Sequence, residues 1–268
     1  MDKPIKSGII AEVLDSTHAS FKKGEFVFGN LDWKEYQASN GDGLTKIDKT
    51  VSPLTSYLGV LGMTGLTAYL GLTEIGIPKS GETLVVSGAA GAVGSIVGQI
   101  GKIMGCMVVG ITGSNPKSEL LKSKFKFDQA INYKTTPDLS EAIQKACPNG
   151  VDIYFDNVGG EISDAVLENI NKHARLPVCG YISLYNETKQ PMGPRLQPII
   201  LTKSATMRGF IVGDFSAKFP VARKQLTTWL QEGKLTYAET IVHGFENIPQ
   251  AFIDLFEGKN DGKMIVKI

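Results

Sequence analysis

The segment from Thr83 to Lys102 constrains the fold more than any other part of the sequence. Residues 83–87 form an apolar run, residues 88–94 are almost all small, and residues 95–102 have helical character. A strand that feeds a glycine-rich turn at the start of a helix lets backbone amides approach a pyrophosphate closely. Ala89 replaces the first glycine of the G-x-G-x-x-G pattern, so the context supports the match more than the spacing does. We interpret the segment as a dinucleotide-binding turn; the alternative is that small residues only allow close helix–sheet packing.

Similar apolar runs recur along the chain with helical segments between them. Runs without alternation suit strands that are buried on both faces, and alternating strands and helices predict a parallel sheet. The predicted fold class is therefore α/β, a Rossmann doubly wound parallel sheet. Its strands are expected at residues 83–87, 107–112, 129–132, 152–156, 174–179 and 206–210.

The two ends of the sequence predict a smaller β lobe. Strand-like runs at residues 8–14, 25–29 and 33–38 precede a polar, turn-rich stretch at 41–53 and a helix over 58–72. Two more strand-like runs, 240–245 and 264–268, enclose a helix near 248–256. We expect residues 1–58 to form part of a substrate lobe, 59–235 the nucleotide-binding domain and 236–268 a return to the substrate lobe.

The end of the strand at 107–112 bears on the cofactor. An NAD site places an acidic residue there for the ribose hydroxyls, but this chain continues Gly-Ser-Asn-Pro-Lys. The hydroxyl of Ser114 and the ammonium of Lys117 suit a 2′-phosphate, so the sequence favours NADPH over NADH. The alternative is that Lys117 is one more solvated lysine at the start of a helix.

Two further segments follow predicted strands, residues 156–160 and 179–186. Ligands bind at the carboxyl ends of parallel strands. Each segment alone could be an ordinary turn, but their occurrence in successive strand units favours a shared crevice.

Composition excludes several classes of protein. The net charge is +1 and the basic residues are dispersed, so we expect no binding to nucleic acid or to a membrane surface. No apolar run approaches the roughly 18 to 20 residues that span a bilayer, and the chain start has no signal core, so we expect a cytoplasmic protein. Metal and nucleophile chemistry are unsupported, because no G-x-S-x-G elbow occurs and ligand spacing is absent among Cys106, Cys147, Cys179, His18, His173 and His243.

The sequence from about Lys3 to Ile268 resembles the zinc-independent medium-chain dehydrogenases/reductases, specifically the NADP-dependent prostaglandin reductase and alkenal double-bond reductase group. The segments that carry the resemblance are GMTGLTAY at 62–69, AGAVGSIVGQ at 90–99, NYK at 132–134, YFDNVGG at 154–160, CGYISLYN at 179–186 and GKNDGK at 258–263.

The resemblance implies a GroES-like small lobe and a set of NADPH contacts. Gly91, Ala92, Val93 and Gly94 would lie along the pyrophosphate, Lys117 and Tyr133 at the 2′-phosphate, and Asn157 along the cofactor. The nicotinamide would be walled by Cys179, Gly180, Ile182, Ser183, Tyr185, Phe210, Ile211 and Val212, with Met63 nearby and Asn260 reaching back from the small lobe.

The implied reaction is hydride transfer to the β-carbon of an α,β-unsaturated ketone or aldehyde. Tyr185 is the expected catalytic residue, because its phenol can donate to the carbonyl oxygen as negative charge develops there. Either Tyr185 or water could protonate the α-carbon. The alternative for Tyr185 is a packing role with its hydroxyl on a loop carbonyl.

Members of this group begin with further small-lobe strands, so the small lobe is expected to be amino-terminally incomplete; a shortened chain, a late gene start and a natural truncated form all account for this. Two other functions stay open: a quinone reductase of the same superfamily, and a non-catalytic, lens-crystallin-like NADPH-binding protein. We also expect a homodimer, formed through the edge strand at 206–210.

Overall fold

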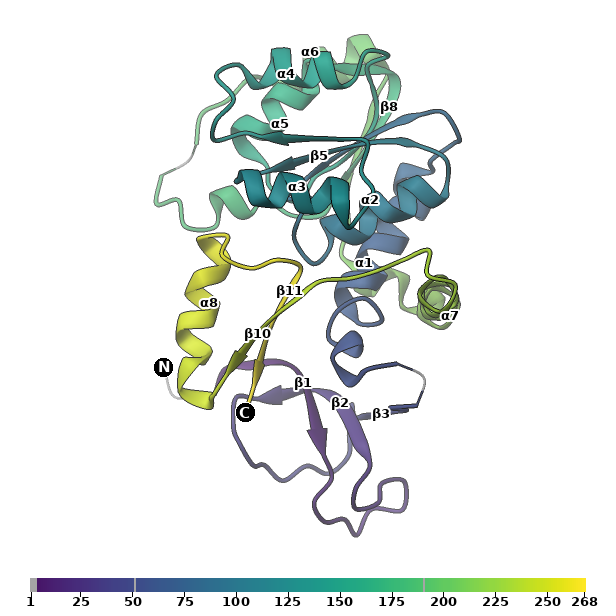
Figure 1. The fold of residues 1–268 in the computed structure, drawn as a ribbon, viewed down its shortest axis with the longest axis vertical. Coiled ribbons are helices and arrows are strands. Elements are labelled where there is room, and N and C mark those ends of the chain that lie inside the picture. The colour runs from purple at the N-terminus through teal and green to yellow at the C-terminus, as the bar shows by residue number, and fades with distance from the viewer. Residues whose placement is uncertain (1–3, 51, 190) are drawn as a thin grey trace.

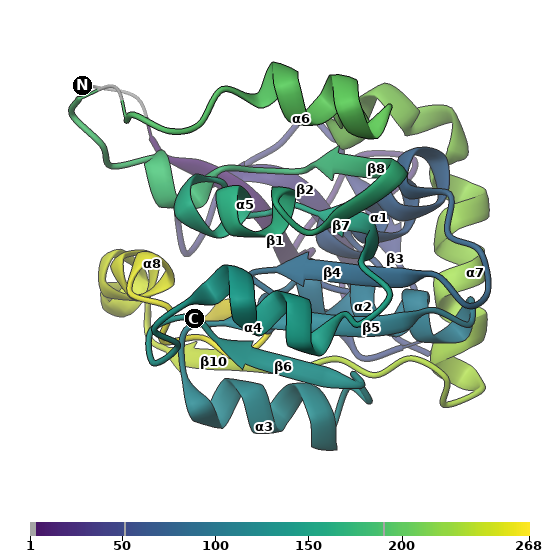
Figure 2. The ribbon, with the colours of Figure 1, turned by 90° about the horizontal axis from the view of Figure 1, so that it is seen from above.

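A six-stranded parallel sheet forms the centre of the computed structural model, which describes residues 4–50, 52–189 and 191–268. Its strand order is β6-β5-β4-β7-β8-β9, and Figure 2 shows the strands from β8 to β6 side by side. The predicted doubly wound sheet is confirmed, although β8 begins earlier than expected. The bounds are β4 (Thr83–Ser87), β5 (Met107–Thr112), β6 (Gln129–Asn132), β7 (Val151–Phe155), β8 (Ile170–Val178) and β9 (Thr206–Gly209).

Helices cover both faces of this sheet (Figure 1). Side chains alternate between the faces: Leu84 and Val86 join one apolar core, while Val85 joins the other. The first core includes α1 (Met63–Gly71), α2 (Gly94–Ile103), α3 (Asn115–Ser123) and, packed on α1, α7 (Phe219–Gln231). The second includes α4 (Leu139–Ala146), α5 (Gly160–Leu167) and α6 (Leu196–Lys203).

The small lobe is an antiparallel sheet of β1 (Lys6–Glu12), β2 (Phe26–Asp32) and β3 (Thr45–Ile47). The strand expected at 33–38 is wrong, because the Gln37 side chain accepts from Asp32 N at 3.3 Å and donates to Asp32 O at 3.2 Å, which turns the chain. The third strand lies instead within the stretch 41–53, where Ile47 is buried.

The helix expected over 58–72 is interrupted. The chain forms a 3₁₀ turn η1 (Leu54–Tyr57), α1, and a π-helical turn η2 (Leu72–Gly76). A Cβ on Gly62 would lie 2.1 Å from Tyr57 O, and one on Gly65 would lie 1.7 Å from Val60 O. The chain therefore folds tightly back on itself around the start of α1.

The last segment forms a two-stranded parallel sheet of β10 (Glu239–His243) and β11 (Lys263–Lys267), with α8 (Ile248–Phe256) between them. Phe252 of α8 contacts Trp33 of the small lobe, with ring centroids 6.4 Å apart. At the other end, Gly262 N donates to Ala90 O at 2.9 Å, so β11 starts beside the glycine turn. Short 3₁₀ helices complete the structure: η3 (Ile182–Leu184), η4 (Val212–Lys218) and η5 (Phe245–Asn247). No helix within the described ranges is long and apolar enough to cross a membrane.

Candidate cofactor and active site

A crevice of about 430 Å³ lies where β4, β5, β7 and β8 end. The carboxyl ends of parallel strands meet at one edge of the sheet, which is where ligands bind in such folds. The crevice is lined by Gly88, Ala90, Gly91, Ala92, Val93, Gly94, Thr112, Gly113, Lys117, Asn157, Val158, Cys179, Gly180, Ile182, Tyr185, Leu255, Asn260, Gly262, Lys263 and Met264.

The glycine turn joins β4 to α2 and is packed most tightly at Gly94. Gly88 has a left-handed φ of 58°, and a Cβ on Gly94 would lie 2.5 Å from Gly88 O. Ala89 is fully buried and faces Gly110. A Cβ added to Gly110 would lie 2.9 Å from the Cβ of Ala89. The alanine that departs from the glycine pattern therefore faces the core and leaves the crevice unobstructed. α2 begins at Gly94, which lines the crevice, so the positive end of the helix dipole favours a pyrophosphate there, although Ser95 N and Ile96 N already donate to Gly91 O and Val93 O.

One end of the crevice is formed by the end of β5 and the start of α3. Lys117 lines it, and its Nζ donates to Gly258 O at 2.7 Å. Burial lowers the pKa of Lys117, an effect that Asp261 opposes. Ser114 is the N-cap of α3 and accepts from Lys117 N at 3.4 Å. The Tyr133 ring lies beside Gly113. A Cβ added to Gly113 would lie 3.2 Å from Cε1 of this ring.

Tyr185 lies at the opposite end of the crevice. Its side chain is 51% exposed, and its ring is nearly perpendicular to that of Tyr181 at a centroid distance of 4.7 Å. Its hydroxyl is 3.4 Å from where a Cβ on Gly180 would stand. Across the described ranges, no side-chain hydrogen bond involves this phenol, so it is free to donate to a ligand. The neighbouring Cys179 thiol stays protonated, because burial raises its pKa to about 12.

The far wall comes from the return segment at the end of the chain. Asn260 lines the crevice and donates through Nδ2 to Gly262 O at 2.7 Å. Lys263 also lines it, and burial lowers the pKa of its amine.

The crevice brings together eleven of the predicted residues: Gly91, Ala92, Val93, Gly94, Lys117, Asn157, Cys179, Gly180, Ile182, Tyr185 and Asn260. Nine further lining residues were not predicted individually, although Gly88, Ala90 and Val158 lie in the segments 88–94 and 156–160 that were expected at the site: Gly88, Ala90, Thr112, Gly113, Val158, Leu255, Gly262, Lys263 and Met264. Their position next to predicted residues at strand ends could have indicated most of them; nothing in the sequence indicated Leu255.

Other predicted residues lie outside the crevice lining, and their cofactor contacts stay predictions. Met63 is exposed at the start of α1, and Ser183 donates to Val158 O at 2.6 Å. Phe210 packs edge-on against Phe155 at 6.2 Å. The full set is Met63, Ser114, Tyr133, Ser183, Phe210, Ile211 and Val212.

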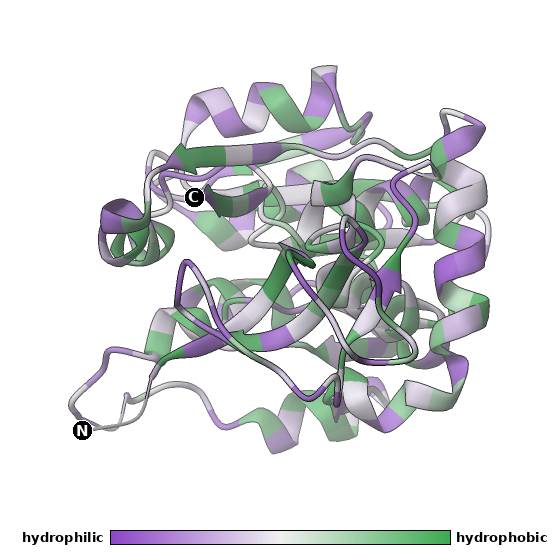
Figure 3. Cartoon of the chain, turned by 90° about the horizontal axis from the view of Figure 1, so that it is seen from below, coloured by the Kyte–Doolittle hydropathy of each residue, from purple (hydrophilic) through white to green (hydrophobic). Residues whose placement is uncertain are grey.

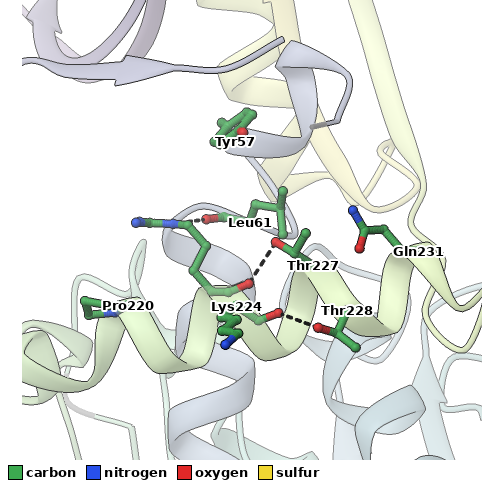
Figure 4. A pocket seen from close by; sticks show the side chains of 8 residues that line it. Tyr57, Leu61, Pro220, Lys224, Thr227, Thr228 and Gln231 are labelled. Atoms are coloured by element: carbon green, nitrogen blue, oxygen red, sulfur yellow. Dashed lines mark hydrogen bonds between the residues drawn. The ribbon is translucent and has the colours of Figure 1, made fainter. Parts of the chain in front are cut away.

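A second cavity, of about 480 Å³, lies between α7 and the residues before α1 (Figure 4). Arg223 Nε donates to Leu61 O at 3.0 Å, and the hydroxyls of Thr227 and Thr228 donate to carbonyls of their own helix. This cavity has neither strand ends nor a glycine turn, so it lacks the parts of a nucleotide site. In the portion of the chain that the structure describes, no three His, Cys, Asp or Glu side chains are grouped to hold a metal ion.

Comparison with known proteins gives consistent matches. A family model described as zinc-binding dehydrogenase matches residues 92–228, and one described as the N-terminal domain of oxidoreductase matches residues 1–47. The chain is 45% identical to the 2-alkenal reductase (NADP(+)-dependent) of Nicotiana tabacum over 99% of its own length and 77% of that protein. It is 46% identical to prostaglandin reductase 1 of Bos taurus over 96% of its length and 79% of that protein. The crystal structure of CurA in complex with NADPH from Vibrio vulnificus is 45% identical, with a TM-score of 0.92, covering 98% of this chain and 79% of that one.

Proposed function

This chain belongs to the zinc-binding dehydrogenase family, among the NADP-dependent reductases that include alkenal and prostaglandin reductases, and we propose that it reduces the carbon–carbon double bond of α,β-unsaturated ketones or aldehydes with NADPH. The observation that carries the proposal is the Tyr185 phenol, which makes no internal hydrogen bond in the described structure and lies in the crevice that the glycine turn begins. A free donor at this place suits a substrate whose oxygen gains negative charge.

The residues of the crevice fit NADPH. The glycine turn places no bulky side chain against the pyrophosphate, and the Lys117 ammonium suits the 2′-phosphate. The nucleotide supplies the hydride when it is bound. Tyr185 then donates a hydrogen bond to the carbonyl oxygen, which stabilises the enolate more than the neutral carbonyl. The protonated Cys179 thiol takes no part as a nucleophile, because the thiolate is the reactive form.

The test is NADPH consumption, followed by its absorbance, with an enone and with a quinone at matched concentrations. Preferred turnover of the enone, with the saturated ketone or aldehyde as product, is the expected result. A preference for the quinone would favour a quinone reductase of the same superfamily. NADPH binding without consumption by any enone would favour a non-catalytic binding protein.

Zinc independence is part of this proposal despite the name of the family. The three histidines lie far apart in sequence, and no metal-binding group occurs among residues 4–50, 52–189 and 191–268. We expect that exhaustive treatment with a chelator leaves enone reduction intact. Bound zinc in a one-to-one ratio, with turnover lost when it is removed, would refute this.

Three further proposals concern the protein as a whole. The free cysteines suit a reducing compartment, which supports a cytoplasmic location. The three separate sheets, which lie within residues 6–47, 83–209 and 239–267, support domains at 1–58, 59–235 and 236–268. An exposed edge strand supports a homodimer, as argued below.

A further inference from the structure

Asp156 places a buried carboxyl group directly after β7, next to Asn157 and Val158, which line the crevice. Its side chain is 6% exposed. Its Oδ1 accepts from the Ser87 hydroxyl at 3.0 Å and from the Tyr154 phenol at 2.9 Å, and its Oδ2 accepts from the Ser163 hydroxyl at 2.6 Å. A buried carboxylate is tolerated only when donors satisfy it, and here they come from β4, β7 and α5.

The same carboxyl group fixes the turn that follows β7. Val158 N and Gly159 N both donate to Asp156 Oδ1, each at 2.9 Å. Backbone amides can only donate, so an acceptor is required at this point. Ser87 extends the arrangement, because its Oγ accepts from Asn157 N at 2.9 Å and its carbonyl accepts from Asn157 Nδ2 at 2.8 Å. Asn157 and Val158 both line the crevice.

The turn at 157–159, together with Asp156, holds the loop at 179–183, which follows β8. Asp156 O accepts from Cys179 N at 2.8 Å and from Gly180 N at 3.1 Å. Val158 O accepts from Ser183 N at 3.1 Å and from Ser183 Oγ at 2.6 Å. The loop after β8 is therefore attached to the turn after β7 at both of its ends.

We propose that Asp156 is the positioning residue of this crevice: it sets the turn at 157–159, the turn sets the loop at 179–183, and the loop places the Tyr185 phenol. Asp156 itself does not line the crevice, so it acts through other residues. The proposal rests on the proposed function for the identity of NADPH as the ligand. The turn requires an acceptor oxygen at the Oδ1 position. The negative charge of the carboxylate contributes less to the conformation of the turn than this acceptor does.

Two substitutions separate geometry from charge. Asp156→Ala removes the acceptor and leaves the amides of Val158 and Gly159 without a partner. Asp156→Asn keeps an oxygen at the Oδ1 position, and its new amide can donate to Ser163 Oγ. The Ser163 hydroxyl can then turn towards the Tyr154 oxygen, which lies 2.9 Å away.

Asp152 supplies the matched control, since it lies near the start of β7, the strand that Asp156 directly follows. Its carboxyl oxygens accept from Thr83 N and Asn171 Nδ2, both at 2.8 Å. Asp152→Ala should cost stability without changing NADPH affinity, because Asp152 is far along β7 from the crevice. Ser87→Ala is a fourth variant, which keeps Asp156 but cuts its connection to Asn157.

The experiment measures NADPH dissociation constants by fluorescence, and backbone hydrogen–deuterium exchange, in the wild type and the four variants. Asp156→Ala should weaken NADPH binding by about tenfold or more and speed exchange at 157–160 and 179–185 while β4 and β5 stay protected. Asp156→Asn and Asp152→Ala should bind within about threefold of the wild type. If Asp156→Ala does not fold, Ser87→Ala tests the proposal instead. We expect Ser87→Ala to weaken NADPH binding several-fold.

Wild-type affinity and exchange in a folded Asp156→Ala would overturn the proposal, as would unchanged binding in Ser87→Ala. An equal loss in Asp156→Asn and Asp156→Ala would also overturn it, because charge would then be the operative property. No readout involves a substrate. A wild-type protein that binds NADPH but reduces no enone refutes the proposed function and leaves this test standing.

Discussion

The phenol of Tyr185 can be tested with a single-atom change. Tyr185→Phe keeps the ring and its edge-on contact with Tyr181 but removes the donor. Because the donor acts on charge that develops in the transition state, turnover should fall by roughly tenfold or more while NADPH affinity stays nearly unchanged. The measurement is steady-state turnover with NADPH and enone saturating and with hydride transfer shown to be rate-limiting by a deuterium isotope effect.

Tyr181 provides the control, because it is an exposed phenol on the same loop that does not line the crevice. Tyr181→Phe should turn over like the wild type. Unchanged turnover in Tyr185→Phe would leave Tyr185 as a packing residue.

Lys117 carries the predicted preference for NADPH. Lys117→Ala should weaken NADPH binding by roughly tenfold or more, the typical worth of a charged hydrogen bond, and should barely affect NADH. Titrating both nucleotides by fluorescence measures the ratio. The control is Lys122→Ala on the same helix, since Lys122 pairs with Glu119 at the surface. Equal losses for the two nucleotides in Lys117→Ala would contradict the assignment.

Ten of the eleven residues that sequence reasoning located correctly follow strands of the large parallel sheet; the eleventh, Asn260, was expected from the family resemblance. Topology alone gathers such strand ends, so Asn157, Gly180 and Lys117 could be placed in one crevice before any contact was known. Leu255 could not, because it reaches the crevice through the docking of α8, which depends on tertiary packing.

Among the secondary-structure elements, α2 approaches the sheet so closely that its glycines matter for stability. A Cβ on Gly98 would lie 1.9 Å from Cζ of the buried Phe127. Gly98→Ala should therefore lower the free energy of unfolding by about 1 to 3 kcal/mol, as overpacking of a core does. Urea denaturation measures the loss. NADPH affinity of the folded protein should change little, because Gly98 lies one turn beyond the glycine turn.

Gly213→Ala is the matched control, since a Cβ at Gly213 would meet nothing within 4 Å. It should leave the unfolding midpoint almost unchanged. A wild-type midpoint in Gly98→Ala would mean that Phe127 moves aside at no cost.

The elements that sequence reasoning misplaced are those set by side chains rather than by periodicity. The buried strands of the large sheet were located within a residue or two at most ends, because long apolar runs have few alternatives. The run at 33–38 has the composition of a strand, yet the Gln37 side chain bonds back to Asp32 and ends β2 there. The three residues of β3 are too few to show a pattern.

For the molecule as a whole, β9 leaves one edge of the large sheet open. All four of its residues are exposed, and no residue of the neighbouring α6 is fully buried, although hydrophobic residues alternate with hydrophilic ones along it (Figure 3). Leu201 is 79% exposed and Ile211 is 72% exposed. Unpaired edges and apolar surface of this kind are usually covered by a partner. A second copy of the chain, related by a two-fold axis, would cover the edge of β9 and the apolar surface together. An interface of ordinary size buries about 800 Å² of accessible surface on each partner.

Light scattering after size-exclusion chromatography should therefore give twice the mass of one chain. The double substitution Leu201→Glu with Ile211→Glu should give monomers, because it places charge on the apolar surface. Val221→Glu, a matched change at an exposed position of α7, should leave the dimer intact. A wild-type monomer at micromolar concentration would rule out this interface.

Two hydrogen bonds, from Gly262 N to Ala90 O and from Lys117 Nζ to Gly258 O, join distant parts of the polypeptide. They close a loop of chain between the glycine turn and the last strand, and loops of that length lose substantial entropy when their ends are joined. A nucleotide held between the two walls acts as a removable cross-link across the same loop. Its binding would add RT ln(1 + [L]/Kd) to the stability of the folded state, so residues 236–268 should open less often as the concentration of NADPH rises.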